Sequence, residues 1–139
     1  MSVIAILALL LVSCSNPASD SDTEAIPAGA YKYRAYDSTG TKVVEGWFRL
    51  DLQDSSSFEG EWHTEAVGSP ENTGHQVGDG NLIGHLQVDN RIWLNFNPGW
   101  RDNNVFLYGD YSIDDISGSW IWETFVGVTN HGTFEAEMQ

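Results

Sequence analysis

The segment Val44-Glu-Gly46-Trp-Phe48 carries the pattern that decides the fold, because the chain repeats its spacing. In this pattern a glycine stands at the centre of five residues, a large residue stands two positions before it and another stands two positions after it. The same spacing recurs at Phe58-Glu-Gly60-Glu-Trp62, Leu82-Ile-Gly84-His-Leu86, Leu107-Tyr-Gly109-Asp-Tyr111 and Ile116-Ser-Gly118-Ser-Trp120, with a truncated copy at Gly132-Thr-Phe134. Successive strand side chains point to opposite faces, so the glycine and both large residues of each copy share one face.

That shared face is predicted to be the interior of a barrel. The residues between the repeated positions are often charged or polar, as at Glu45, Glu59 and Asp110. Glycine weakens a strand, so its recurrence needs a physical reason. Closing a small sheet supplies one, since strands must bend sharply and small residues must alternate with large ones inside. We predict an all-β, eight-stranded antiparallel up-and-down β-barrel, with a two-sheet β-sandwich as the alternative.

Short alternating runs separated by turn residues define the expected strands. They cover residues 30–38, 42–53, 58–67, 81–88, 91–97, 105–112, 116–125 and 131–138. Parity then gives the expected interior: Val44, Phe48, Leu50, Leu52, Phe58, Trp62, Leu82, Leu86, Val88, Ile92, Leu94, Phe96, Leu107, Tyr111, Ile116, Trp120, Trp122, Phe134, Ala136 and Met138.

The amino-terminal segment has the features of an export signal. Residues 1–13 are uncharged and largely apolar, too short to span a bilayer but long enough for a signal-peptide core. They end in Leu11-Val12-Ser13-Cys14, which resembles the lipobox of bacterial lipoproteins. The resemblance implies a signal peptide over 1–13 and a lipid-modified Cys14 that anchors the protein to a membrane. It places the protein in the cell envelope, at the outer membrane if the host is Gram-negative, with the domain in the periplasm or at the cell surface.

Residues 14–28 are expected to be the lipidated cysteine followed by a flexible acidic tether, because they are small, polar and acidic with two prolines. Residues 29–139 then form one β-barrel domain. The net charge of −14 argues against nucleic acid as a partner, since such binding depends on neutralising phosphates. It also leaves the lipid as the expected membrane contact.

The meander with Gly-x-Trp spacing looks like the calycin group, which contains the lipocalins and avidins. The segments from Phe58 to Trp62 and from Leu82 to Leu86 are similar in layout to avidin hairpins, and the resemblance covers about residues 44–138. It implies the barrel shape, and no ligand is carried over from it.

Catalytic motifs are sparse, so we expect no enzyme and no cofactor. His63 lies between Glu61 and Glu65 on the outward face, a trio that could hold a divalent metal. A solvated strand surface is the commoner meaning of such a trio, and no metal site is expected. Trp47 and Trp93, both of outward parity, are candidates for an exposed aromatic pair, although packing across strands under a long Arg or Glu side chain is the commoner role of such residues.

Long loops at one end of the barrel point to a binding mouth. The connections at residues 68–80 and 97–104 open at the same end, together with the first and seventh connections. The primary hypothesis is binding of a small, partly apolar ligand in this mouth. The alternative is a solid barrel that contacts an envelope protein or a polysaccharide. The candidate ligand-binding residues are Trp62, Phe96, Trp100, Arg101, Trp120 and Trp122.

Overall fold

A computed structural model describes residues 26–139, which form eight β-strands and no helix. The strands are β1 (Gly29–Asp37), β2 (Lys42–Leu52), β3 (Ser57–Ala66), β4 (Gly78–Gln87), β5 (Arg91–Asn95), β6 (Asn103–Tyr111), β7 (Asp115–Thr124) and β8 (Gly127–Met138). The predicted signal peptide, Cys14 and most of the predicted tether lie outside the described residues. Within those residues, no helix is long and apolar enough to cross a membrane.

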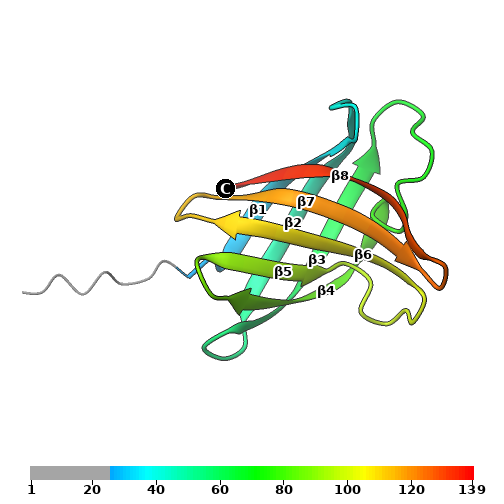
Figure 1. The fold of residues 1–139 in the computed structure, drawn as a ribbon. Coiled ribbons are helices and arrows are strands. Elements are labelled where there is room, and N and C mark those ends of the chain that lie inside the picture. Colours follow the sequence, from blue (N-terminus) through cyan, green and yellow to red (C-terminus); the bar gives the residue numbers. More distant parts are fainter. Residues whose placement is uncertain (1–25) are drawn as a thin grey trace, which may run out of the picture.

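Each strand pairs with its sequence neighbour in antiparallel orientation, and β8 returns to pair with β1, which closes the barrel (Figure 1). The closing register sets Tyr33 opposite Ala136 and Ala35 opposite Phe134. The predicted up-and-down barrel is therefore confirmed, and the sandwich alternative is wrong. The short turns enforce this order, since a tight connection leaves only the antiparallel neighbour within reach.

The barrel interior is filled with side chains rather than hollow along its length. Phe48, Phe96 and Trp120 are among the largest side chains with almost no exposed surface. The ring of Tyr33 lies 5.4 to 6.0 Å from three phenylalanine rings, which makes an aromatic layer across the core. Burying rings of this size supplies much of the hydrophobic stabilisation of a small domain.

Two predicted interior residues are exposed. Leu52 is 39% exposed and Val88 is 81% exposed. Strand β2 ends at Leu52 and β4 ends one residue before Val88, so both side chains lie at the end of the barrel, where solvent reaches them. Leu86, Trp122 and Met138 are partly buried against the core, and the other predicted interior residues are buried.

The repeated glycines allow neighbouring strands to approach closely. A Cβ on Gly60 would overlap the carbonyl oxygen of Arg49 on β2, and one on Gly118 would overlap the carbonyl oxygen of Tyr108 on β6. Gly132 is confined between the Tyr36 carbonyl and the indole of Trp120. The sequence repeat therefore marks the places where a small barrel has no room for a side chain.

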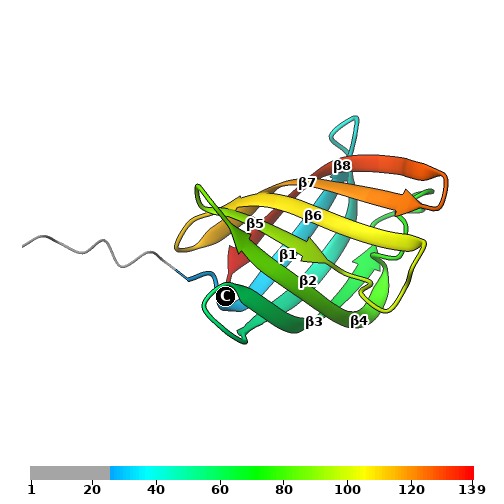
Figure 2. The ribbon, with the colours of Figure 1, turned by 60° about the horizontal axis from the view of Figure 1, so that its bottom comes forward.

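The two ends of the barrel differ in their connections (Figures 1 and 2). The β2–β3, β4–β5 and β6–β7 turns lie at the same end as Gly29, where the described chain enters β1. The β1–β2, β3–β4, β5–β6 and β7–β8 connections lie at the other end, which we call the mouth. The longest connection, residues 67–77 between β3 and β4, belongs to the mouth.

Candidate functional site

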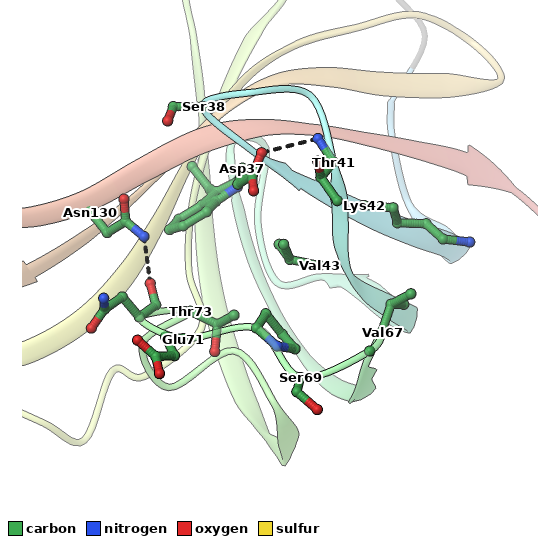
Figure 3. A pocket seen from close by; sticks show the side chains of 14 residues that line it. Asp37, Ser38, Thr41, Lys42, Val43, Val67, Ser69, Glu71, Thr73 and Asn130 are labelled. Carbon is green, nitrogen blue, oxygen red and sulfur yellow. Dashed lines mark hydrogen bonds between the residues drawn. The ribbon is translucent and has the colours of Figure 1, made fainter.

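A cavity of about 450 Å³ opens at the rim of the mouth, and we call it the rim pocket. Its walls come from the β1–β2 turn, the β3–β4 loop and the start of β8. Figure 3 shows Asp37 and Thr41 of the turn facing Glu71 and Thr73 of the loop, with Val43 between the two walls. The lining residues are Asp37, Ser38, Thr41, Lys42, Val43, Val67, Gly68, Ser69, Pro70, Glu71, Asn72, Thr73, Trp120 and Asn130.

The apolar part of the rim pocket comes from Val43, Val67, Pro70 and Trp120. Trp120 is fully buried, and its indole N–H donates a 2.9 Å hydrogen bond to the carbonyl oxygen of Tyr36. This bond fixes the ring and satisfies its only polar atom, so the buried ring forms a rigid apolar base behind the pocket. A ligand in this pocket would meet Val67 and Pro70 together with polar groups of the turn and the loop.

The polar wall of the turn is preorganised by its own hydrogen bonds. The carboxylate of Asp37 accepts bonds from the Thr39 hydroxyl at 2.6 Å and from the N–H of Thr41 at 3.0 Å. These bonds lower the pKa of the Asp37 carboxyl, and the bond from the Thr39 hydroxyl has the largest effect. Lys42 is held by Glu45 at 2.7 Å. The charged groups of this wall are therefore already committed to the protein.

The β3–β4 loop is fastened to the barrel by a buried glutamine. Gln76 is fully buried, accepts a 2.8 Å hydrogen bond from the hydroxyl of Tyr33 and donates one of 2.8 Å to the Thr73 carbonyl oxygen. The hydroxyl of Thr64 donates to the backbone carbonyl of Gln76. Gln76 thus closes the top of the aromatic core and leaves the rim pocket beside it.

Two further contacts hold the same loop against the mouth. The Asn130 side-chain amide donates 2.7 Å to the carbonyl oxygen of Asn72 (Figure 3), and the Asn97 amide donates 2.8 Å to the carbonyl oxygen of His75. Gly74 lies against the ring of Trp122, with room for no Cβ. Four strands therefore fix one long loop, which explains how a polar segment keeps a defined shape.

The six predicted ligand-binding residues divide into three groups. Trp62 and Phe96 are buried in the core and stack with ring centroids 5.3 Å apart. Trp120 and Trp122 lie at the mouth, the first lining the rim pocket and the second supporting the loop. Trp100 and Arg101 are exposed on the β5–β6 connection, with Trp100 stacked 4.9 Å from His75. Only Trp120 lines the rim pocket.

Trp47 and Trp93 do not form the aromatic pair considered from the sequence. Trp47 lies 6.4 Å from His63, whereas Trp93 stacks 5.6 Å from both His85 and Phe106. The two tryptophans lie on β2 and β5, which are separated by two strands. Among residues 26–139, no group of three His, Cys, Asp or Glu side chains gathers in a way that could hold a metal ion.

Sequence reasoning missed most of the rim pocket. Its polar lining comes from turn and loop residues such as Ser38, Glu71 and Asn130, which follow no strand period. The role of Gln76 was not predicted either, because this residue lies in a polar loop without a strand period. The one available signal was the length of the connection at 68–80, which did indicate the correct end of the barrel.

No family model and no curated protein matches this chain. Among solved structures, a de novo designed fluorescence-activating β-barrel is similar, with a TM-score of 0.50 and 11% identity. The match covers 81% of this chain and 93% of the designed one. At that identity the likeness concerns the fold alone: this chain is a closed eight-stranded antiparallel β-barrel.

Proposed function

We propose that this protein binds a small, partly apolar molecule in the rim pocket and does not catalyse a reaction. The observation that carries the proposal is the pocket of about 450 Å³ with Trp120 in its wall. Pockets for small molecules typically enclose about 300–1,000 Å³ and combine apolar walls with a few fixed polar groups. The rim pocket has this size, and its lining combines apolar side chains with a larger number of polar turn and loop residues.

Because the core is filled, we place the ligand at the rim rather than in the barrel interior. The space that a ligand along the barrel axis would need is occupied by twenty buried apolar residues, and the buried side chain of Gln76 lies over them. Displacing a buried aromatic ring would cost about 3–5 kcal/mol, by comparison with the effect of truncating one. Binding at the rim needs no such displacement, because the pocket is already open.

We also propose that Cys14 carries a lipid and that the mouth faces away from the membrane. The support is geometric, because Gly29 lies at the end of the barrel opposite the mouth (Figure 1). A tether on the amino-terminal side would approach the membrane from the closed end. The rim pocket would then remain accessible to molecules in the surrounding compartment.

Fluorescence titration of the full chain with Nile red, a neutral apolar dye, tests the rim pocket. Val67→Trp places a bulky ring in the pocket wall, whereas Val88→Trp adds the same ring to an exposed turn at the opposite end. We expect saturable binding by the wild type and by Val88→Trp, and loss of binding by Val67→Trp. Absence of saturable binding by the wild type, or equal binding by all three proteins, would contradict the proposal.

Lipidation is tested separately, by growing the native host with radiolabelled palmitate. The wild-type chain should incorporate label and partition into detergent, and Cys14→Ser should do neither. Incorporation by the serine variant would show that the lipid is attached elsewhere.

A further inference from the structure

Two clefts, one between β4 and the β5–β6 connection and one over β2, β3 and β4, share four lining residues and so form one groove. Their volumes are about 250 and 390 Å³, and they share Trp62, Asp79, Gly80 and Asn81. The first cleft extends to Trp100 on the β5–β6 connection, and the second extends to Trp47 on β2. The groove therefore runs past Asp79 and Asn81 with a tryptophan on each side. None of the residues shared by the two clefts lines the rim pocket.

Both flanking tryptophans are exposed, and each lies beside a histidine ring. Trp47 is 37% exposed with its ring centroid 6.4 Å from that of His63 on the neighbouring strand, and Trp100 is 58% exposed and stacks 4.9 Å from His75. A ring that is exposed yet held in place offers a flat apolar surface at little entropic cost of binding. Neither ring belongs to the buried core, so the fold does not explain why they are tryptophans.

The floor between the rings carries polar groups without a protein partner. Strand register places Trp47, His63 and Asp79 in one row across the barrel, so Trp47 and Asp79 are about 10 Å apart. Within residues 26–139, neither the Asp79 carboxylate nor the Asn81 side-chain amide makes a hydrogen bond or ion pair. Asp37 and Asp51, by contrast, are engaged by turn donors or by arginine.

We propose that this groove binds a neutral oligosaccharide. The C–H face of a sugar ring packs on an exposed indole, and a carboxylate accepts hydrogen bonds from vicinal hydroxyls while an amide both donates and accepts. Trp47 and Trp100 supply the two stacking surfaces, and Asp79 and Asn81 supply the polar contacts between them. An extended chain of sugars matches a groove with repeated stacking positions better than a single small molecule does.

The charges of the groove exclude an anionic saccharide. The two clefts are lined by Glu61 and Asp79 and by no lysine or arginine. The guanidinium of Arg49, next to this surface on β2, is already paired with Asp51 and Glu61. An acidic sugar would therefore meet two carboxylates and no cation in the lining of either cleft. A basic peptide is the competing ligand class, and ionic strength separates the two because it screens charge contacts and leaves sugar stacking unaffected.

The test is an NMR titration of the full chain with cellohexaose, chitohexaose, laminarihexaose and maltohexaose, observing the indole N–H signals. We expect at least one of these sugars to shift the Trp47 and Trp100 signals and to leave the Trp93 signal in place. Trp47→Ala and Trp100→Ala should each weaken binding roughly five- to tenfold. Trp47→Phe should retain most of the affinity, because it keeps a stacking face.

The matched control is Trp93→Ala, which removes a tryptophan from the outer surface away from the groove and should bind as the wild type does. Val67→Trp should also bind normally, which separates this inference from the rim pocket. Three outcomes would overturn the proposal. The first is that none of the four sugars shifts the indole N–H signals, and the second is that Trp93→Ala loses as much sugar affinity as the groove variants. The third is that oligolysine binds instead of the sugars, with an affinity that falls steeply as the salt concentration rises.

Discussion

The hydroxyl of Tyr33 donates a 2.8 Å hydrogen bond to Oε1 of Gln76, and both side chains are fully buried. The bond joins β1 in the barrel core to a loop residue 43 positions further along the chain. It is therefore one of the contacts through which the interior holds the β3–β4 loop over the core.

Removing this bond should destabilise the fold. Tyr33→Phe leaves a buried glutamine oxygen unpaired and Gln76→Met leaves a buried hydroxyl unpaired, each at about 1–3 kcal/mol in the free energy of unfolding. Urea denaturation measures both. The double variant should lose less than the sum of the two single variants, because the second change removes the orphaned partner. Strict additivity would show that the bond contributes nothing.

Tyr31 offers a direct contrast with Tyr33. It is also fully buried, but its hydroxyl has no hydrogen-bond partner within the described part of the chain. Tyr31→Phe should therefore leave the free energy of unfolding unchanged or raise it, since it removes an unsatisfied polar atom. A loss as large as that of Tyr33→Phe, measured in the same urea series, would contradict this account.

The same residue should make the protein sensitive to alkali. Burial, reinforced by Asp115 and Asp114, raises the pKa of Tyr31 from 10.0 to about 12. Between these values the folded protein retains a proton that the unfolded chain loses, so stability falls as pH rises from about 10 to about 12. Tyr31→Phe should flatten this part of the stability profile. A parallel decline in the variant would mean that Tyr31 contributes nothing to it.

The barrel glycines should tolerate no side chain where strands approach closely. Gly118→Ala would force a Cβ into the Tyr108 carbonyl oxygen, and we expect a loss of about 1–3 kcal/mol or more. Gly99→Ala is the matched control, since no atom lies within 4 Å of the added Cβ. Thermal melts of the two variants should differ clearly, and similar melting temperatures would argue against steric closure.

Gly74 should be essential for the closed position of the mouth loop. Its φ of +66° is unfavourable for alanine, and a Cβ would lie 2.6 Å from the Trp122 ring. Gly74→Ala should raise hydrogen exchange of residues 69–76 while exchange of the core strands stays slow. Unchanged exchange in the loop would show that this contact does not hold it.

The fold was predictable because one physical constraint left a visible repeat. Glycines such as Gly60 and Gly118 mark close strand approaches, and the large residues two positions away mark the interior. Tyr31 and Tyr33 on β1 were missed because that strand carries no interior glycine and so lacks the repeat. Leu52 and Val88 were misplaced because parity says which face a residue takes but not where a strand ends.

The candidate site was much less predictable. The rim pocket depends on how the β3–β4 loop folds back, and that path is fixed by long-range bonds of Gln76, Asn97 and Asn130. Polar loop residues carry no periodic signal that would pair them with distant partners. Trp120 was found because it also belongs to a strand repeat.

Native mass spectrometry of the full chain, extracted gently from its own host, determines whether the rim pocket holds a molecule. We expect a complex that carries one small molecule, released by organic solvent, and a ligand-free mass for Val67→Trp prepared in the same way. A ligand-free mass for the wild type, or the same bound molecule on both proteins, would contradict binding in the rim pocket.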